Sequence, residues 1–338
     1  MKYTLAGPGD HADIERLLAQ TDMQSWVRLS FRADLSAPPM HPGAETAHAF
    51  ARDGATLAAC ASRTTMPTPH GPVTWIGGLR VAPAYRGRPG LMRNGLTAIR
   101  ALLLPDSPGW QIAAILSENT AATRLLTRGL PGFPTFTPVQ DLTTLALRPR
   151  RAKIPGIRPA SEADLPPVRA TLAARRGPLL PLIPDDFPAG FPGLSVKDIL
   201  ISDRGGVIAL WDQRPHRAFY VTGYAPALTT LRPLWNLTAP LTGQPSLPPP
   251  GTTLAQAFLA FLHADTTDDA HRLVTAALDL AHRRGLTTAT LGLLPADPLA
   301  ARLRHRAYRS TLYRVTWPDA SPEKLPDLTQ ADVELALL

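Results

Sequence analysis

Four arginines and two glycines gather in one short stretch of the sequence, RVAPAYRGRPGLMR (residues 80–93), which contains no acidic residue. These residues are Arg80, Arg86, Arg88, Arg93, Gly87 and Gly90. Glycine-bearing turns that lead into a helix bind phosphate groups, because backbone N–H groups converge there and the helix dipole adds partial positive charge. The stretch therefore predicts a site for a phosphate-bearing ligand. The alternative is an ordinary strand-to-helix turn whose arginines are simply solvated.

Two familiar phosphate-binding motifs are excluded by inspection. A Walker motif needs Gly-Lys followed by Ser or Thr, whereas Leu91 and Met92 follow Gly90. The dinucleotide fingerprint G-x-G-x-x-G after a strand is absent. Gly77 and Gly78 in the preceding strand predict a β-bulge or a place where a ligand touches the backbone. One bulged strand that leads to one anion-binding turn gives an elongated ligand two successive contacts.

The composition is that of a globular protein. With 338 residues, 44% apolar and 18% charged, the chain is expected to form two domains and is neither disordered nor a membrane protein. The net charge of +8 is spread along the chain without a Lys/Arg block, which favours small anions over nucleic acid. The start of the sequence lacks the apolar core of a signal peptide, so a cytoplasmic protein is expected. The one cysteine, Cys60, lies among small apolar residues and is predicted to be a buried structural thiol.

The elements around the basic turn repeat after about 150 residues. A strand, a turn and a helix begin at residues 3–20 and again at 156–176, and a basic, proline-flanked linker lies at 148–155. The first half is predicted to continue with an irregular region, an antiparallel meander, a helix, a strand, a helix and two closing strands. Their ranges are 22–44, then 46–52, 56–65 and 73–82, then 90–104, 110–117, 119–129, 133–138 and 142–148.

The second half repeats the later part of this order. We expect a strand, a helix, a strand, a helix and a final strand at 255–264, 269–285, 286–294, 297–308 and 310–317. Between the first strand and helix lies DTTDD (residues 265–269), with three acids and no glycine. A diphosphate would be repelled there, so only the first half is expected to bind one.

The order of elements resembles that of the GCN5-related N-acetyltransferase (GNAT) superfamily, in which a strand with Val-x-Pro near its end leads to a glycine-bearing turn and a helix. The resemblance covers most of residues 1–148 and, more faintly, 155–317. It implies an α/β fold of two tandem GNAT-like domains, each a mostly antiparallel mixed sheet flanked by helices. Residues 1–150 would bind acetyl-CoA, 151–320 would form a degenerate copy, and 321–338 a tail.

The turn departs from the family pattern, because Arg86 is followed by Gly87, Arg88 and Pro89, and the third-place glycine is a proline unless one residue is inserted. With that insertion, RGRPGLMR resembles the turn of the enhanced-intracellular-survival acetyltransferases, tandem proteins with an active first copy. The resemblance implies a set of cofactor-binding residues along the strand, the turn and the next strand end. They are Val81, Ala82, Pro83, Arg86, Gly87, Arg88, Gly90, Leu91, Met92, Arg93, Ser117, Glu118 and Asn119.

A free alkyl ammonium has a pKa of about 10.4, so the amine is protonated at neutral pH. A base must remove this proton before the amine can accept an acetyl group. Glu118, Glu45 and His48 are the candidates for this base, directly or through water. The family commonly uses a Tyr as acid on the helix after Asn119, where this chain has Leu125 and Leu126 instead. The resemblance also makes the carboxylate of Leu338 a candidate base. Asn119 has the alternative role of capping that helix.

The sequence thus predicts an acetyl-CoA-dependent N-acetyltransferase acting on a primary amine of a small molecule or peptide. Trp26, Phe31 and Met40 give the 22–44 segment apolar material to cover such an acceptor. No nucleic acid, membrane or metal is expected as a partner, and the protein is expected to be a monomer or homodimer. The alternative is a non-catalytic acyl-CoA sensor or partner-binding module, which the missing Tyr and the irregular turn favour.

Overall fold

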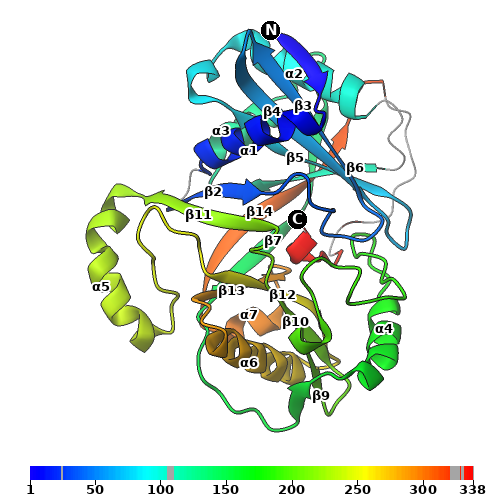
Figure 1. Ribbon diagram of the computed structural model, residues 1–338, viewed down its shortest axis with the longest axis vertical. Coiled ribbons are helices and arrows are strands. Elements are labelled where there is room, and N and C mark those ends of the chain that lie inside the picture. Colours follow the sequence, from blue (N-terminus) through cyan, green and yellow to red (C-terminus); the bar gives the residue numbers. More distant parts are fainter. Residues whose placement is uncertain (24–25, 105–109, 320–327, 329–330, 338) are drawn as a thin grey trace.

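One long sheet runs through both halves of the chain (Figure 1). A computed structural model describes residues 1–23, 26–104, 110–319, 328 and 331–337. In these residues twelve strands form one mixed sheet in the order β1-β3-β4-β5-β6-β14-β7-β13-β12-β10-β9-β8. These strands are β1 (Lys2–Leu5), β3 (Glu45–Asp53), β4 (Thr56–Met66), β5 (Val73–Val81), β6 (Trp110–Leu116), β7 (Thr135–Leu147), β8 (Ile157–Pro159), β9 (Ile199–Ser202), β10 (Val207–Trp211), β12 (Gln256–His263), β13 (Thr288–Leu293) and β14 (His305–Thr316).

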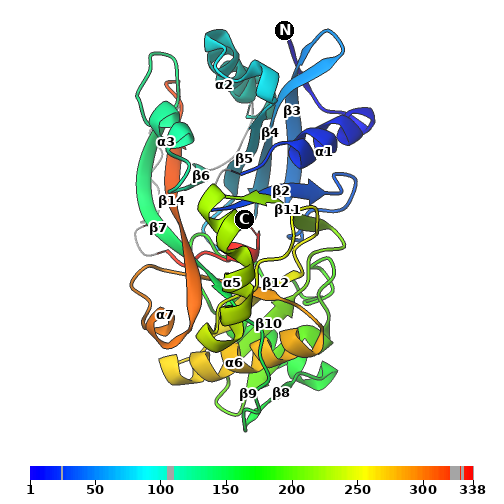
Figure 2. The same cartoon turned by 90° about the vertical axis from the view of Figure 1, so that its left-hand side faces the viewer.

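Helices cover both faces of the first half of this sheet. Leu96, Ile99 and Leu103 of α2 pack on one face, whereas Ile14 and Leu17 of α1 pack on the other (Figure 2). The predicted amphipathic helix at 90–104 and the buried role of its leucines are thereby confirmed. The helices of the described residues are α1 (His11–Gln20), α2 (Pro89–Leu103), α3 (Thr120–Leu126), α4 (Leu165–Ala173), α5 (Pro226–Thr242), α6 (Thr267–Arg283) and α7 (Pro298–Arg302). None of these helices is long and apolar enough to cross a membrane.

The two halves exchange their closing strands. β14, from the second half, lies between β6 and β7, and β7, from the first half, pairs with β13. Ser310 of β14 pairs with Leu116 at the end of β6, and Leu145 of β7 pairs with Leu291 of β13. Each half of the sheet is therefore completed by residues of the other, which brings side chains of β14 to the end of β6.

The second half follows the plan of the first. β12 runs parallel to β13, and α6 packs on the sheet with Leu273, Val274 and Leu278 in its core. Gly285 follows α6 with φ +71°, as expected for the residue that ends a helix. The predicted antiparallel meander of the first half is likewise confirmed, because β3, β4 and β5 are antiparallel neighbours.

Three local predictions are wrong. The expected helix at 297–308 ends at Arg302, and β14 begins at His305. Residues from His305 onward form backbone hydrogen bonds with β7, and the local pattern of apolar residues does not reveal this pairing. The two closing strands expected at 133–138 and 142–148 form the single strand β7 with an irregularity near Pro138. The 22–44 region, expected to be irregular, contains β2 (Val27–Ala33), which pairs with β11 (Arg217–Tyr224) of the second half in a separate two-stranded sheet.

Candidate functional site

An opening lies in the middle of the long sheet, between β5 and β6. The two strands are paired in parallel only from Val73 to Trp75, and β5 then continues to Val81 without pairing to β6. Gly77 of β5 and Ala114 of β6 are exposed, although both strands are interior strands of the sheet. The diverging strands therefore leave backbone edges that an extended ligand can reach (Figure 2).

The edge of β5 carries the bulge predicted from its glycine pair. Arg80 pairs with Cys60 and Gly77 pairs with Ser62, so that Gly78 and Leu79 together face one residue of β4. Gly78 has φ +60°, and a Cβ atom there would collide with the Oγ of Ser62. Only glycine fits this position without rearrangement. The bulge turns the backbone of β5 at the point where the strands diverge.

The basic turn leads from this strand into α2. It contains a short 3₁₀ helix (Pro83–Tyr85), Gly87 with φ +78°, and Arg88 at the N-cap of α2. The side chain of Arg88 makes no capping hydrogen bond, and the first turn of α2 holds no acidic residue. Gly90 is exposed, and nothing lies closer than 4.0 Å to the position of a Cβ atom there. The first turn of α2 therefore presents neither a capping side chain nor an acidic residue, and there is open space at Gly90.

The arginines of the turn have different surroundings. Arg88 stacks on the ring of Tyr85 at 4.2 Å and lies 3.6 Å from a carboxylate oxygen of Asp53. The fold thus brings an acid to a turn that has none in its own sequence. Arg86 donates from Nε to the carbonyl of Val81 at 3.4 Å, and Arg93 is exposed. Arg86 and Arg93 are the exposed arginines of this stretch for which the described residues offer no carboxylate partner, whereas Arg80 is partly buried and donates to the carbonyl of Leu79 at 3.0 Å.

An apolar groove lies between α2 and the sheet. It has a volume of about 40 Å³ and brings together Val81, Leu91 and Met92, three of the residues expected to contact the cofactor. Its other lining residues are Tyr3, Ala49, Phe50, Ala51, Ala59, Cys60, Ala61, Leu79, Gly95, Ala98, Ile99 and Leu102. No charged side chain lines it, and its lining residues from β3 and β4 place it beneath α2, on the side of β5 away from β6.

The end of β6 holds the expected residues Ser117, Glu118 and Asn119, all of which are exposed. Ser117 donates its N–H to the carbonyl of Arg309 at 2.9 Å, which ties the strand end to β14. Asn119 caps α3, because its Oδ1 accepts from the N–H of Ala122 at 3.2 Å. The capping role of Asn119 is thus confirmed, and Glu118 is an exposed acid at the end of β6.

Tyr308 is a site residue that the sequence analysis missed. It lies on β14, one residue before Arg309, and interacts electrostatically with Glu118 and Arg306. Burial raises the pKa of Tyr308, Arg306 opposes this shift, and Glu118 adds to it. Its hydroxyl therefore stays protonated at neutral pH. Leu126, at the place expected for the family's Tyr, is buried in the core beside α3 and offers no such group.

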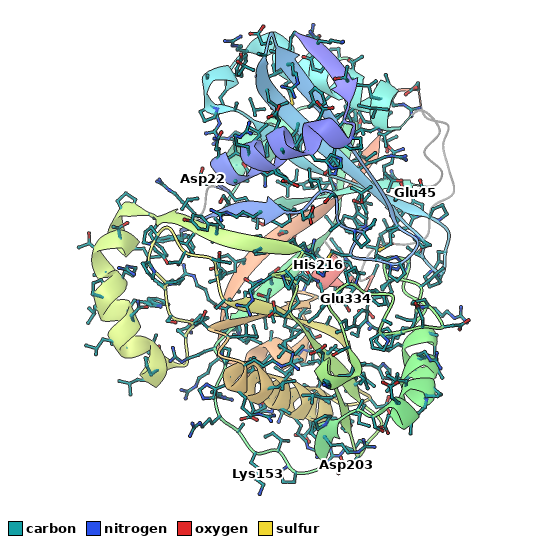
Figure 3. The ribbon with its side chains drawn as sticks, in the orientation of Figure 1. Asp22, Glu45, Lys153, Asp203, His216 and Glu334 are labelled. Carbon is teal, nitrogen blue, oxygen red and sulfur yellow. The ribbon has the colours of Figure 1, made fainter. Side chains whose placement is uncertain are left out.

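The other candidate bases differ in their distance from the opening. Glu45 pairs with Thr65 at the far end of β3 and lies at the outer edge of the molecule (Figure 3), so the structure does not bring it to the site. His48 pairs with Ser62, which pairs with Gly77, and so lies two strands away from the opening, about 10 Å. Burial and the neighbouring His11 lower the pKa of His48, which keeps its imidazole neutral. Leu338 lies outside the described residues.

The apolar residues of the 22–44 segment are spread apart. Trp26 is 52% exposed, Phe31 stacks against Phe219 of β11 at 5.7 Å between ring centroids, and Met40 packs against the core of the second half. Trp26 is the most exposed of the three, and the guanidinium of Arg306 lies 5.9 Å from its ring centroid. Trp26 therefore lies beside Arg306, which is two residues before Tyr308 on β14.

Comparison with solved structures identifies the fold. A GCN5-related N-acetyltransferase from Sphaerobacter thermophilus is 14% identical, covers 95% of this chain and 97% of its own, and has a TM-score of 0.52. A tandem GNAT protein from the clavulanic acid biosynthesis pathway is 12% identical, with coverages of 95% and 99% and a TM-score of 0.53. The N-myristoyltransferase of Saccharomyces cerevisiae, with bound myristoyl-CoA, is 10% identical, with coverages of 97% and 84% and a TM-score of 0.56.

The chain therefore has the mixed α/β fold of the tandem GNAT proteins, as the sequence predicts. No protein-family model matches the sequence, and no curated protein matches it either. Because the identities of these structural neighbours lie between 10% and 14%, the likeness establishes the fold and leaves the activity to be argued from the site.

Proposed function

We propose that the protein is an N-acetyltransferase that moves the acetyl group of acetyl-CoA to a primary amine of a small molecule or peptide, with the cofactor bound in the first half. The observation that carries this proposal is the opening beside the bulge at Gly78, which leads directly to the uncapped N-terminus of α2. In this proposal the cofactor domain is residues 1–150 completed by β14, and the second domain is 151–320 completed by β7.

The described residues suit each part of such a cofactor. The backbone N–H of Gly90 and the cations Arg86 and Arg93 would hold the diphosphate. The edge of β5 that is not paired with β6 would take the pantetheine arm. We also propose that the turn carries one inserted residue relative to the usual GNAT pattern and binds the diphosphate as the turn of the enhanced-intracellular-survival acetyltransferases would.

Bound acetyl-CoA supplies an activated acyl group, whose carbon–sulfur bond breaks as the amine nitrogen bonds to the acyl carbon. Glu118, exposed at the end of β6, would take the proton that the amine loses, directly or through water. Tyr308 would give a proton to the sulfur, because its raised pKa keeps the hydroxyl protonated. The loss of the usual Tyr on α3 is then compensated from β14. Backbone N–H groups at the bulge would face the oxygen that gains charge.

The acceptor would enter from the face that carries α1, beneath β2 and β11. Trp26 and Arg306 lie at that entrance and suit an acceptor with an apolar body. We expect neither nucleic acid nor membrane as a partner, a monomer or homodimer, and a cytoplasmic location.

Thiol release from acetyl-CoA in the presence of a panel of amines tests the proposal. We expect release that depends on one class of amine and that saturates with acetyl-CoA. The alternative, a non-catalytic acyl-CoA sensor, is favoured by the leucines at the usual acid position in α3. Tight binding of CoA without amine-dependent thiol release across the panel would establish that alternative and contradict the enzymatic role.

A further inference from the structure

β12 of the second half repeats the bulge that β5 forms in the first. Ala260 pairs with Ala209 and His263 pairs with Val207, so that Phe261 and Leu262 together face one residue of β10. Phe261 has φ +56°, which matches Gly78 and is rare for a residue with a side chain. The second half thus keeps the bulged strand even where no glycine supports it.

The strands beside this bulge also diverge. β12 and β13 are paired in parallel up to Leu259 and Leu291, and both strands continue beyond that point. The second half therefore contains a cleft between β12 and β13 that corresponds to the opening between β5 and β6. We call it the second cleft.

A segment of the chain itself occupies part of the second cleft. Residues 331–337, here named the tail segment, run into it, and the short helix Leu335–Leu337 contacts both β12 and β13. Glu334 accepts the N–H of Phe261 with Oε2 at 2.8 Å, and it lies in the interior of the molecule with 8% of its surface exposed (Figure 3). A Cβ atom at Gly292 of β13 would collide with Leu335. Leu335 therefore packs closely against β13, while a cavity of about 80 Å³ remains between the tail segment and the ends of β12 and β13.

Backbone carbonyls of the tail segment are held as well. The carbonyl of Ala336 accepts from Nε2 of Gln213 at 2.8 Å and from the guanidinium of Arg217. The carbonyl of Ala331 accepts from Nε2 of Gln140 at 2.7 Å. Three side chains thus bind two carbonyl groups of one segment, which fixes the position of the tail segment against the rest of the chain.

The helix N-terminus at the second cleft differs from that of α2. Thr266 caps α6, because its Oγ1 accepts from the N–H of Asp269 at 3.2 Å, and Asp268 and Asp269 lie in the first turn. At α2 the corresponding turn is uncapped and basic. Asp269 is buried and paired with Arg272, so Asp268, which pairs with Arg204 and Arg302, is the exposed carboxylate of the first turn of α6. The first turn of α2 holds no carboxylate.

We propose that the tail segment is an intramolecular peptide ligand of the second cleft, in which the carboxyl group of Glu334 takes the place that an acyl carbonyl would take on the bulge amide of Phe261. The comparison with an acyl group rests on the proposed function, whereas the docking of the segment does not. Burial raises the pKa of Glu334, which favours the uncharged carboxyl and so a carbonyl-like acceptor. The second half then binds the tail segment in the place of a cofactor. The chain is therefore expected to bind one acyl-CoA, in the first half.

Hydrogen exchange of the full chain, followed by mass spectrometry without any CoA, tests the docking. In the native chain, residues 256–264 and 331–337 should both be protected. Glu334→Ala and Gly292→Ala should each raise the exchange rate of both segments at least about tenfold. Glu334→Gln, which keeps an acceptor oxygen, should retain most of the protection. Asp332→Ala is the matched control, because Asp332 is an exposed acid in the same segment and its loss should change neither rate.

Exchange of the tail segment at the rate of an unstructured peptide in the native chain would overturn the proposal, whatever the variants do. Equal effects of Glu334→Ala and Asp332→Ala would overturn the role of Glu334. A calorimetric titration with acetyl-CoA separates this proposal from the proposed function. Binding of two molecules per chain would contradict an occupied second cleft, whereas no binding with an intact tail segment would contradict only the proposed function.

Discussion

Gly78 lies directly against Ser62, so closely that a Cβ atom at Gly78 would collide with the Ser62 Oγ. This contact fixes the bulge of β5 at the level where β5 and β6 have parted. The same two strands then leave Gly77 and Ala114 exposed inside a twelve-stranded sheet. The contact between Gly78 and Ser62 thus sets the backbone on which the proposed acyl site depends.

Gly78→Ala should destabilise the chain by about 1–3 kcal/mol, because alanine must adopt φ +60° and displace Ser62. Adding Ser62→Ala should restore part of this loss by removing the Oγ, which denaturant unfolding of the single and double variants will measure. If Gly78→Ala unfolds at the native denaturant concentration, the bulge geometry described here is contradicted.

Tyr308→Phe should lower kcat about 10- to 100-fold and leave the KM for acetyl-CoA unchanged, because the hydroxyl would protonate the leaving sulfur and would not contribute to cofactor affinity. Steady-state thiol release measures both constants. Tyr313→Phe is the control, since Tyr313 lies on the same strand and packs in the core on the opposite face. An unchanged kcat in Tyr308→Phe would remove Tyr308 from the mechanism.

Cys60 should resist thiol reagents in the native chain. Burial raises the pKa of Cys60 to about 11, the nearby Arg80 lowers it, and 4% of the residue is exposed. At pH 8 the thiolate fraction is then about a thousandth, so modification by Ellman's reagent should be slower than for a free cysteine by about two orders of magnitude. Denaturation should restore the ordinary rate. Rapid modification of the folded chain would show that Cys60 is accessible.

The stability of the chain should fall between about pH 6.5 and pH 4 because of His41. Burial lowers the pKa of His41 to about 4, and only 4% of the residue is exposed. Since the unfolded chain binds a proton near pH 6.5 and the folded chain does not, acid favours unfolding within this window, by about 2 kcal/mol at pH 4.5. Urea unfolding at pH 7 and 4.5 should show this loss in the native chain and a smaller one in His41→Leu. If the native chain and His41→Leu lose the same free energy of unfolding, the acid sensitivity comes from groups other than His41.

Much of the fold follows from local patterns in the sequence. The meander over 46–82 and the helix at 90–104 alternate apolar residues with the periods of strands and helices, and both are found as predicted. The exchange of β7 and β14 was not predictable in this way. The alternation of apolar and polar residues can predict that β14 is a strand, but it does not show which strands pair with it. The residues from Arg304 to Tyr308 are also compatible with the end of a helix.

Some features of the candidate site could likewise be predicted from local sequence, and others could not. The bulge at Gly78 and the open turn at Gly90 follow from glycines and arginines that are adjacent in sequence, and local geometry suffices to predict them. Tyr308 lies almost 200 residues beyond Glu118 and reaches it only through the strand exchange. Asp53 reaches Arg88 in a similar way, from the end of β3. Contacts of this kind depend on tertiary pairing that no local pattern records.

Calorimetric titration of acetyl-CoA into the native chain and into Gly90→Leu tests the central claim most directly. Gly90 is exposed, with no atom closer than 4.0 Å to a Cβ position, so a leucine fits the fold while covering the N–H groups of the first turn of α2. Gly9→Leu, at another exposed glycine with open space, is the control. We predict one-to-one binding by the native chain and by Gly9→Leu, weakened at least about tenfold in Gly90→Leu. Absence of binding by the native chain, or equal affinity in Gly90→Leu, would contradict the account.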